Sequence, residues 1–515
     1  MLIAGGLGCS GPGQPVVLDA RPTPSSGNAV AEVEPSVPAS SDSPTSTTAV
    51  DGTTVPTAPT DADSRPEPAD VPSRSVSVGD PRFPQLGSAD IDVDHYDVEL
   101  LYEPDPQRLD GVVTIELTTT TATDRVALDA ESLEVRSVRV DGVEQSFALG
   151  DRELVTALAS VVPAGRELDV VVEYGVDLDG GGVDLDGGIF PTVDGLWSVN
   201  EPMGASTWIP SNDHPTDKAT WSFAVTVPDG DTAVLNGAFT GSSDAVGGTT
   251  TWAWEQSEPM APYLILFLVG DYQLVDGGVT DSGVELRHAA IDDSERTIGR
   301  YSSVTVQQFE FFEPLFGPYP LDRYGLAITD SIPGLAMETQ GLSLFSRGDL
   351  DGSLGFVQHL LLAHELAHQW FGNAVSPATW DDIWLNEGFA TYAQWLWLDH
   401  VGLLPLEAAA SGALAQSPTD EGAVARPDEL FGAVSYDAGA TVLHALRVTV
   451  GDETFFEGLR SWVVEHRDSS ASTADFAVHM SRVAGQDLEP FFDEWVYAED
   501  RPDRFPGSGA PAAEA

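Results

Sequence analysis

Residues 357–372, VQHLLLAHELAHQWFG, carry the pattern from which the fold of the whole chain is inferred. Their apolar side chains recur with the period of a helix, and the segment contains the motif HELAH at residues 364–368. Residues i and i+4 of a helix share one face, so both imidazoles of the motif can reach a single ion. Zinc accepts neutral imidazole and tolerates an open fourth position. The motif therefore predicts a zinc site, with Glu365 beside the metal as a base for water.

A third ligand is predicted at Glu387. Positions 369–386 separate it from His368, and it stands in the segment WLNEGFATY at residues 384–392. This segment is typical of the start of a second helix, which a turn and a short loop can bring back beside the first. Two histidines and one glutamate form a catalytic set that leaves the fourth position to water. We expect one Zn²⁺ per chain, held by His364, His368 and Glu387.

The chain on either side of these helices divides into regions of different periodicity. Residues 89–290 contain runs such as HYDVELLYE and ELDVVVEYGV, whose alternation predicts an antiparallel β domain. Residues 291–402 mix helical periods with a strand and predict an α/β catalytic domain. Residues 403–500 are helical and predict a closing subdomain. The expected fold class is therefore α+β and multidomain.

The two ends of the chain have a different composition. Residues 10–88 are rich in Pro, Ser and Thr and contain no aromatic side chain before Phe83, which predicts a disordered tether. Residues 501–515 predict a disordered tail. Residues 1–9, MLIAGGLGC, are similar to the end of a lipoprotein-type signal, with Cys9 as the lipidated residue. We expect an exported protein tethered to the outer face of a bacterial membrane, or otherwise a secreted one.

The charge of the chain excludes one class of partner, and its cysteine content excludes two kinds of structural cross-link. The chain has 23 Lys and Arg against 82 Asp and Glu, a formal net charge of −59. Nucleic acid is excluded as a partner because phosphate binding needs clustered basic residues. A single cysteine excludes an intrachain disulfide and a cysteine-based zinc ribbon. The membrane is expected as a partner only through a lipid on Cys9.

The segments HELAHQWFG and WLNEGFATY resemble the signatures of the aminopeptidase N family of gluzincin metallopeptidases. Residues 212–220, NDHPTDKAT, are similar to the segment that ends the β domain in that family. The resemblance covers roughly residues 90–500 and implies a thermolysin-like catalytic domain that removes N-terminal residues from peptides with a free N-terminus. Members often add a helical-repeat domain. We expect that domain to be absent here and the site to be more open as a result.

The same resemblance implies a role for a tyrosine outside the two helices. Tyr436, in the segment YDAGATVLH at residues 436–444, matches a tyrosine that hydrogen-bonds the oxyanion. A phenol beside zinc can donate to a developing alkoxide without losing its own proton. A core tyrosine is the structural alternative for this position.

The resemblance also implies a site for the substrate amine. Glu338, with Ala336 and Met337 before it, matches the exopeptidase motif Gly-Ala-Met-Glu-Asn, from which Leu335 and Thr339 depart. The implied roles are pairing with the amine for Glu338 and substrate binding for Ala336 and Met337. Glu201 is expected to reach the same amine.

Three alternatives to an aminopeptidase stay open at this point. An endopeptidase would share the zinc site and have no use for Glu338. An epoxide hydrolase would share the same residues. A surface-tethered binding protein with an inactive site would keep the fold alone, although it would have no physical reason to keep the ligand set. The oligomeric state and the preferred first residue of the substrate are left open.

Overall fold

The structure is a computed structural model that describes residues 76–150, 152–178, 187–245, 247–291, 295–331, 334–350, 355–417 and 421–507. These residues belong to one compact unit of the chain. The signal-like segment with Cys9, the predicted tether up to residue 75 and residues 508–515 lie outside the described residues. Within the described part, no helix is both long enough and apolar enough to cross a membrane.

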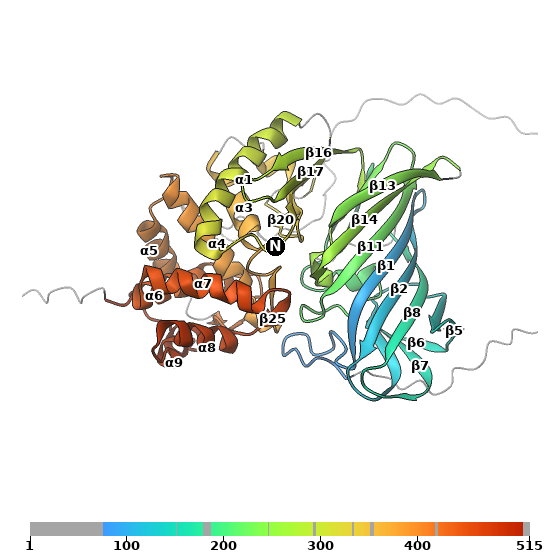
Figure 1. Ribbon diagram of the computed structural model, residues 1–515, viewed down its shortest axis with the longest axis horizontal. Coiled ribbons are helices and arrows are strands. Elements are labelled where there is room, and N and C mark those ends of the chain that lie inside the picture. Colours follow the sequence, from blue (N-terminus) through green and yellow to red (C-terminus); the bar gives the residue numbers. More distant parts are fainter. Residues whose placement is uncertain are drawn as a thin grey trace, which may run out of the picture. The chain divides into compact units, whose positions relative to one another are not determined.

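The N-terminal domain contains an eight-stranded sheet, whose strands lie side by side in Figure 1. Its order is β13 (Ala238–Ala245), β14 (Thr249–Met260), β11 (Ala219–Pro228), β1 (Ile91–Pro104), β2 (Gln107–Thr119), β8 (Glu167–Asp177), β4 (Ser137–Val140) and β5 (Val143–Glu144). Alternate side chains of β1 are buried, as the period-two pattern predicts. One pairing departs from the antiparallel expectation, because β1 and β11 run parallel.

Two smaller sheets complete this domain. One has the order β12 (Thr232–Leu235), β15 (Phe267–Gly270), β10 (Gly195–Val199) and β9 (Gly188–Thr192). The other has the order β3 (Thr123–Asp129), β7 (Glu153–Val162) and β6 (Phe147–Leu149). Short 3₁₀ turns stand at η1 (Ala205–Thr207) and η2 (Pro262–Leu264). The four-stranded sheet matters for function because Glu201 follows its strand β10.

The catalytic domain has a mixed six-stranded sheet, and its boundary differs from the prediction. The order is β16 (Tyr272–Val279), β17 (Glu285–Ile291), β19 (Leu326–Thr329), β21 (Ser343–Ser346) and β20 (Ala336–Met337), with β18 (Arg323–Tyr324) also paired to β17. The first two strands therefore belong to the catalytic domain, and the β domain does not extend to residue 290. Alternation identifies a strand but not the sheet that it joins, which is why the boundary was wrong.

Helices of the catalytic domain and the closing subdomain share one hydrophobic core. Those of the catalytic domain are α1 (Glu295–Phe316), α2 (Arg347–Leu350), α3 (Gly355–Ala367) and α4 (Trp384–His400), with the 3₁₀ turn η3 (Trp380–Asp382). The closing subdomain contains α5 (Leu406–Gln416), α6 (Gly439–Val450), α7 (Asp452–His466), α8 (Thr473–Ala484) and α9 (Glu489–Phe492), with π-helical turns η4 (Val434–Ala438) and η5 (Asp493–Tyr497). Their buried side chains form a single cluster. The predicted fold class is confirmed.

Short strands interrupt the closing subdomain, which was expected to be helix and loop. They are β23 (Gly422–Ala423) and β24 (Arg426–Pro427), which pair with each other, and β25 (Ser469–Ala471), which pairs in parallel with β22 (Val375–Pro377) of the catalytic domain. The second pairing joins the closing subdomain to the loop that follows the predicted zinc-binding helix.

Both predicted disordered ends are too long. Residues 76–88 make ordered contacts with the folded body, beginning with a bridge between Ser77 and Ser88. At the other end, Phe505 stacks on Trp495 and packs edge-on against His444. In each segment an aromatic side chain, Phe83 or Phe505, buries apolar surface that the polar composition around it conceals.

Candidate metal centre

Helix α3 brings the side chains of the two histidines of the HELAH motif close together. His364 lies in its last turn, and His368 directly follows its last residue, with the His368 amide still donating to the His364 carbonyl. The two rings are 4.6 Å apart between centroids and each side chain is 1 % exposed. The i, i+4 spacing has therefore placed both imidazoles on the same face, as the sequence predicts.

Helix α4 brings the third predicted ligand against them. Glu387 stands in its first turn, and its Oε2 lies 3.1 Å from Nε2 of His364 and 3.5 Å from Nε2 of His368. A hydrogen bond from Nδ1–H of His368 to the carbonyl of Phe371, at 3.2 Å, orients the ring so that Nε2 faces this carboxylate.

The donor set of these three residues fits zinc. The ligand atoms of His364, His368 and Glu387 lie within 4.8 Å of one another, and all three residues are buried. Two imidazole nitrogens and one carboxylate oxygen match the ligands of a catalytic zinc ion with one position open. Two further acids, Glu201 and Glu338, reach the same point. A dication is what stabilises so many buried carboxylates close together.

Glu365 lies beside the triad rather than within it. Neither of its carboxylate oxygens has a hydrogen-bond partner among the described residues, although the side chain is buried. Burial raises the pKa of Glu365 well above its usual range, and the neighbouring Glu338 adds to the effect while His368 opposes it. A carboxylate with an uncommitted acceptor and a raised pKa is suited to taking up a proton.

Tyr436 reaches the centre from the π-helical turn η4. Its ring stacks on His364 with centroids 6.0 Å apart and planes 15° apart, and its hydroxyl hydrogen-bonds Glu387. Burial, followed by the carboxylates of Glu387 and Glu201, raises the pKa of Tyr436 well above its usual value. The phenol stays protonated at neutral pH and so can donate to an oxyanion.

Glu338 follows the edge strand β20, which consists of the buried residues Ala336 and Met337. Its Oε1 lies 3.8 Å from Nδ1 of His368 and has no hydrogen-bond partner among the described residues. Burial opposes a charge on His368, but the carboxylates of Glu338 and Glu387 raise the pKa of that imidazole to about 10. The Glu338 carboxylate therefore lies directly beside the triad residue His368.

Glu201 approaches the centre from the β domain. It follows β10, is 2 % exposed, and shares a cluster with Glu338 and Glu387 whose ligand atoms lie within 4.8 Å of one another. Burial and the Glu338 carboxylate raise the pKa of Glu201 to about 8. The predicted ligands, Glu365, Tyr436 and the two further acids are thus brought to one place by elements of the β domain, the catalytic domain and the closing subdomain.

The loop after α3 contains residues that the sequence did not single out. The backbone carbonyl of Glu338 accepts hydrogen bonds from Gln369 at 3.1 Å and from the Asn373 amide at 2.7 Å. Lys218 of the β domain donates to the carbonyls of Asn373 at 2.7 Å and Ala374 at 3.0 Å. The sequence shows Lys218 as the only lysine of the chain, within the segment at residues 212–220, but does not show its contacts with this loop.

Asp381 and Asp382 lie just before α4, and neither contacts a ligand imidazole among the interactions of the described residues. Asp381 pairs with Arg82, and Asp382 forms a capping box with Thr379 and accepts from Thr473. These contacts hold the turn that leads into α4.

Comparison with known proteins agrees with this geometry. The model of the Peptidase M1 N-terminal domain matches residues 92–264, and that of the Peptidase family M1 domain matches residues 301–495. A solved M1 zinc metallopeptidase from Deinococcus radiodurans is similar at 30 % identity with a TM-score of 0.76, covering 84 % of this chain and 99 % of that one.

Curated relatives are more distant and longer. Aminopeptidase 2 of Candida albicans is 26 % identical over 434 residues, which cover 78 % of this chain and 46 % of the relative. Aminopeptidase N of Lactococcus lactis is 29 % identical over 411 residues, which cover 72 % and 47 %. The chain spans about half the length of these curated relatives. The family resemblance inferred from the sequence is confirmed, and the chain belongs to peptidase family M1, the zinc metallopeptidases.

Proposed function

We propose that this protein is a zinc aminopeptidase that removes N-terminal residues from peptides. The observation that supports this most is the pair of buried acids, Glu338 and Glu201, that lie beside the triad without belonging to the predicted ligand set. At a centre of this kind, amide hydrolysis uses a metal, a base and an oxyanion donor, and none of these measures distance from a peptide end. A fixed anion at one residue's distance from the metal can measure that distance, because it pairs with the terminal amine.

In the proposed mechanism, zinc held by His364, His368 and Glu387 would polarise the scissile carbonyl and lower the pKa of water. Glu365 accepts the proton of the attacking water and returns it to the leaving amine. The Tyr436 hydroxyl donates to the oxygen that develops negative charge, which its raised pKa allows at neutral pH.

Substrate positioning is assigned to the acids and to the edge strand. Glu338 and Glu201 pair with the α-ammonium of the substrate, and each charge-assisted hydrogen bond is worth about 1.5–3 kcal/mol. The strand of Ala336 and Met337 is at the edge of the catalytic sheet, where its backbone groups can bind an extended peptide. A mutant of the Deinococcus radiodurans enzyme has been solved with a Tyr-Ser-Ala substrate, which is consistent with this proposal.

The proposed activity is tested with a panel of aminoacyl-arylamides. The metal is first removed with a chelator and then returned as zinc in stoichiometric steps. We expect hydrolysis to disappear with the chelator and to recover in proportion to zinc, saturating at one ion per chain. Zinc binding without any hydrolysis across the panel would favour the inactive binding protein.

We further propose that the protein is exported and held at the outer face of a bacterial membrane through a lipid on Cys9. The support is the sequence alone, in which small apolar residues lead to Cys9 and a long polar segment follows. Partition of the protein from its own host into a detergent phase, abolished by Cys9→Ser, would support this location. An unmodified Cys9 on a secreted product would contradict it.

A further inference from the structure

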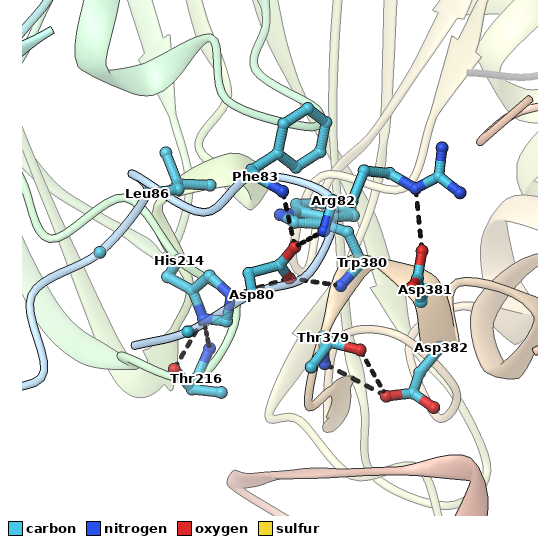
Figure 2. A network of polar contacts seen from close by, with 12 residues as sticks. Asp80, Arg82, Phe83, Leu86, His214, Thr216, Thr379, Trp380, Asp381 and Asp382 are labelled. Atoms are coloured by element: carbon cyan, nitrogen blue, oxygen red, sulfur yellow. Dashed lines mark hydrogen bonds and ion pairs between the residues drawn. The ribbon is translucent and has the colours of Figure 1, made fainter. Parts of the chain in front are cut away.

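Residues 76–88, here called the strap, precede the first strand of the β domain and contact three regions of the body. Asp80 is at their centre and is 1 % exposed. Its Oδ1 accepts hydrogen bonds from the amides of Arg82 and Phe83, both at 2.8 Å, which close a tight turn. Figure 2 shows the Asp80 carboxylate between the amides of this turn and the backbone amide of Trp380, with His214 close by.

The second carboxylate oxygen of Asp80 joins the β domain to the catalytic domain. Its Oδ2 accepts from the backbone amide of Trp380 at 2.7 Å and lies 3.3 Å from Nε2 of His214. Nδ1 of His214 accepts from the Thr216 amide, so the ring proton is on Nε2 and is donated to Asp80. Burial opposes the charge on Asp80, but these hydrogen bonds hold the pKa of the carboxyl below its usual value.

The side chains of Arg82 and Phe83 add further contacts to the same region. Nε of Arg82 donates to Asp381 at 3.0 Å, and its other nitrogens donate to the carbonyls of Pro427 and Asp428 in the closing subdomain. The ring of Phe83 packs edge-on against Trp380, with centroids 6.3 Å apart. The strap therefore contacts turn η3 at Trp380 and Asp381 and also reaches the closing subdomain.

Turn η3 matters because α4 begins two residues after it. Glu387 is the fourth residue of α4, so the direction in which η3 points fixes the direction of this ligand. On the side facing away from the strap, Asp382 accepts from the amide of Thr473 at 2.8 Å and from its hydroxyl at 2.6 Å. Asp80 and Arg82 supply the opposing attachment, from residues about three hundred positions earlier in the chain.

We infer that the strap is a positioning element of the metal centre, in which Asp80 holds turn η3 so that Glu387 meets His364 and His368. Asp80 touches neither substrate nor metal. Its carboxylate accepts from the first backbone amide of η3, and Arg82 adds an ion pair with Asp381 of the same turn. Outer attachments that orient a ligand carry a measurable part of metal affinity, commonly 10–100-fold.

The experiment measures zinc affinity of the full-length chain by competition with a chromogenic chelator, without any peptide. This readout holds whether or not the proposed aminopeptidase activity is found. In Asp80→Ala we expect zinc affinity to fall by about tenfold or more, with activity recovered when zinc is raised. Asp80→Asn should show a smaller loss, because one amide oxygen can still accept. Arg82→Gln should show the smallest.

Two control variants separate positioning from general effects. Val172→Ala leaves a cavity in the core of the β domain and lowers stability away from η3. Asp97→Ala removes the same charge from the exposed face of β1. Both should keep zinc affinity within twofold of the wild type. Asp80→Ala, or Asp80→Asn if the alanine variant does not fold, binding zinc as tightly as these controls would overturn the inference.

Discussion

The two segments that carry the metal ligands reach the centre by different physical routes. His364 and His368 are neighbours on α3, and the helix alone brings their rings within 4.6 Å. Glu387 is on α4, whose start is held by Asp80 and Thr473, both far away in the chain. Spacing on one helix is a local property that the sequence displays directly. The placement of α4 is a tertiary property that depends on contacts between segments.

This difference predicts which property a substitution in each segment will change. A substitution of Glu365 on α3 that keeps the shape of its side chain should affect chemistry and leave zinc bound, because Glu365 is not a ligand. A substitution in the attachments of the second segment should affect how well the site is assembled. The following predictions separate these two kinds of effect.

Glu365→Gln should give the largest loss of activity. The amide keeps the shape of the side chain on α3 but cannot accept the proton of water, so kcat should fall by about 10²–10⁴-fold. Zinc content, measured by metal analysis, should stay at one ion per chain. A variant that holds zinc and hydrolyses at nearly the wild-type rate would show that another group is the base.

Tyr436→Phe should lower kcat by about 10²–10³-fold, with KM little changed. The ring remains stacked on His364, and the hydroxyl is removed together with its interaction with Glu387. Steady-state kinetics on one arylamide substrate give both constants. An unchanged kcat would return Tyr436 to the role of a core residue.

Lys218→Met should have a smaller effect, on stability rather than on chemistry. The variant loses two hydrogen bonds to the loop after α3, so the unfolding midpoint in urea should fall. Burial lowers the pKa of Lys218 to about 7, from 10.5 in the unfolded chain. Stability from this group is complete above pH 10.5 and decreases as the pH falls toward 7.

The gap between wild type and Lys218→Met should therefore widen in favour of the wild type between pH 7 and pH 10. Urea unfolding of both proteins at the two ends of this range measures it, and the other titrating groups cancel in the difference. A constant gap would show that Lys218 keeps its ordinary pKa in the folded protein, and a narrowing gap would show that this pKa is raised.

The same contrast explains what the sequence could and could not predict. The helical period, the HELAH motif and the spacing to Glu387 are visible along the chain and led to the correct family and fold class. Ordered packing of residues 76–88 was missed, because the partners of Asp80 are His214 and Trp380, which no local pattern connects to it. Strand β16 was given to the wrong domain for the same reason.

Some features of the site have only a partial signal in the sequence. Asn373 is an ordinary loop residue until the structure shows its amide donating to the carbonyl of Glu338. Lys218 stands out in the sequence as the only lysine and lies in the segment at residues 212–220, but no role follows from that. Its partners are backbone carbonyls, which every residue has, so the sequence cannot identify them.

The central claim is that a buried pair of acids makes this zinc peptidase cut only at a free N-terminus. The direct measurement is kcat/KM for a tripeptide with a free amine and for its N-acetylated copy, in wild type and in Glu338→Ala, with zinc content checked in both. We expect the wild type to prefer the free amine by about 100-fold or more. The acetyl group removes the cation that two carboxylates bind. In Glu338→Ala the preference should shrink by at least about tenfold. Equal rates on both peptides in the wild type would contradict the account and favour an endopeptidase.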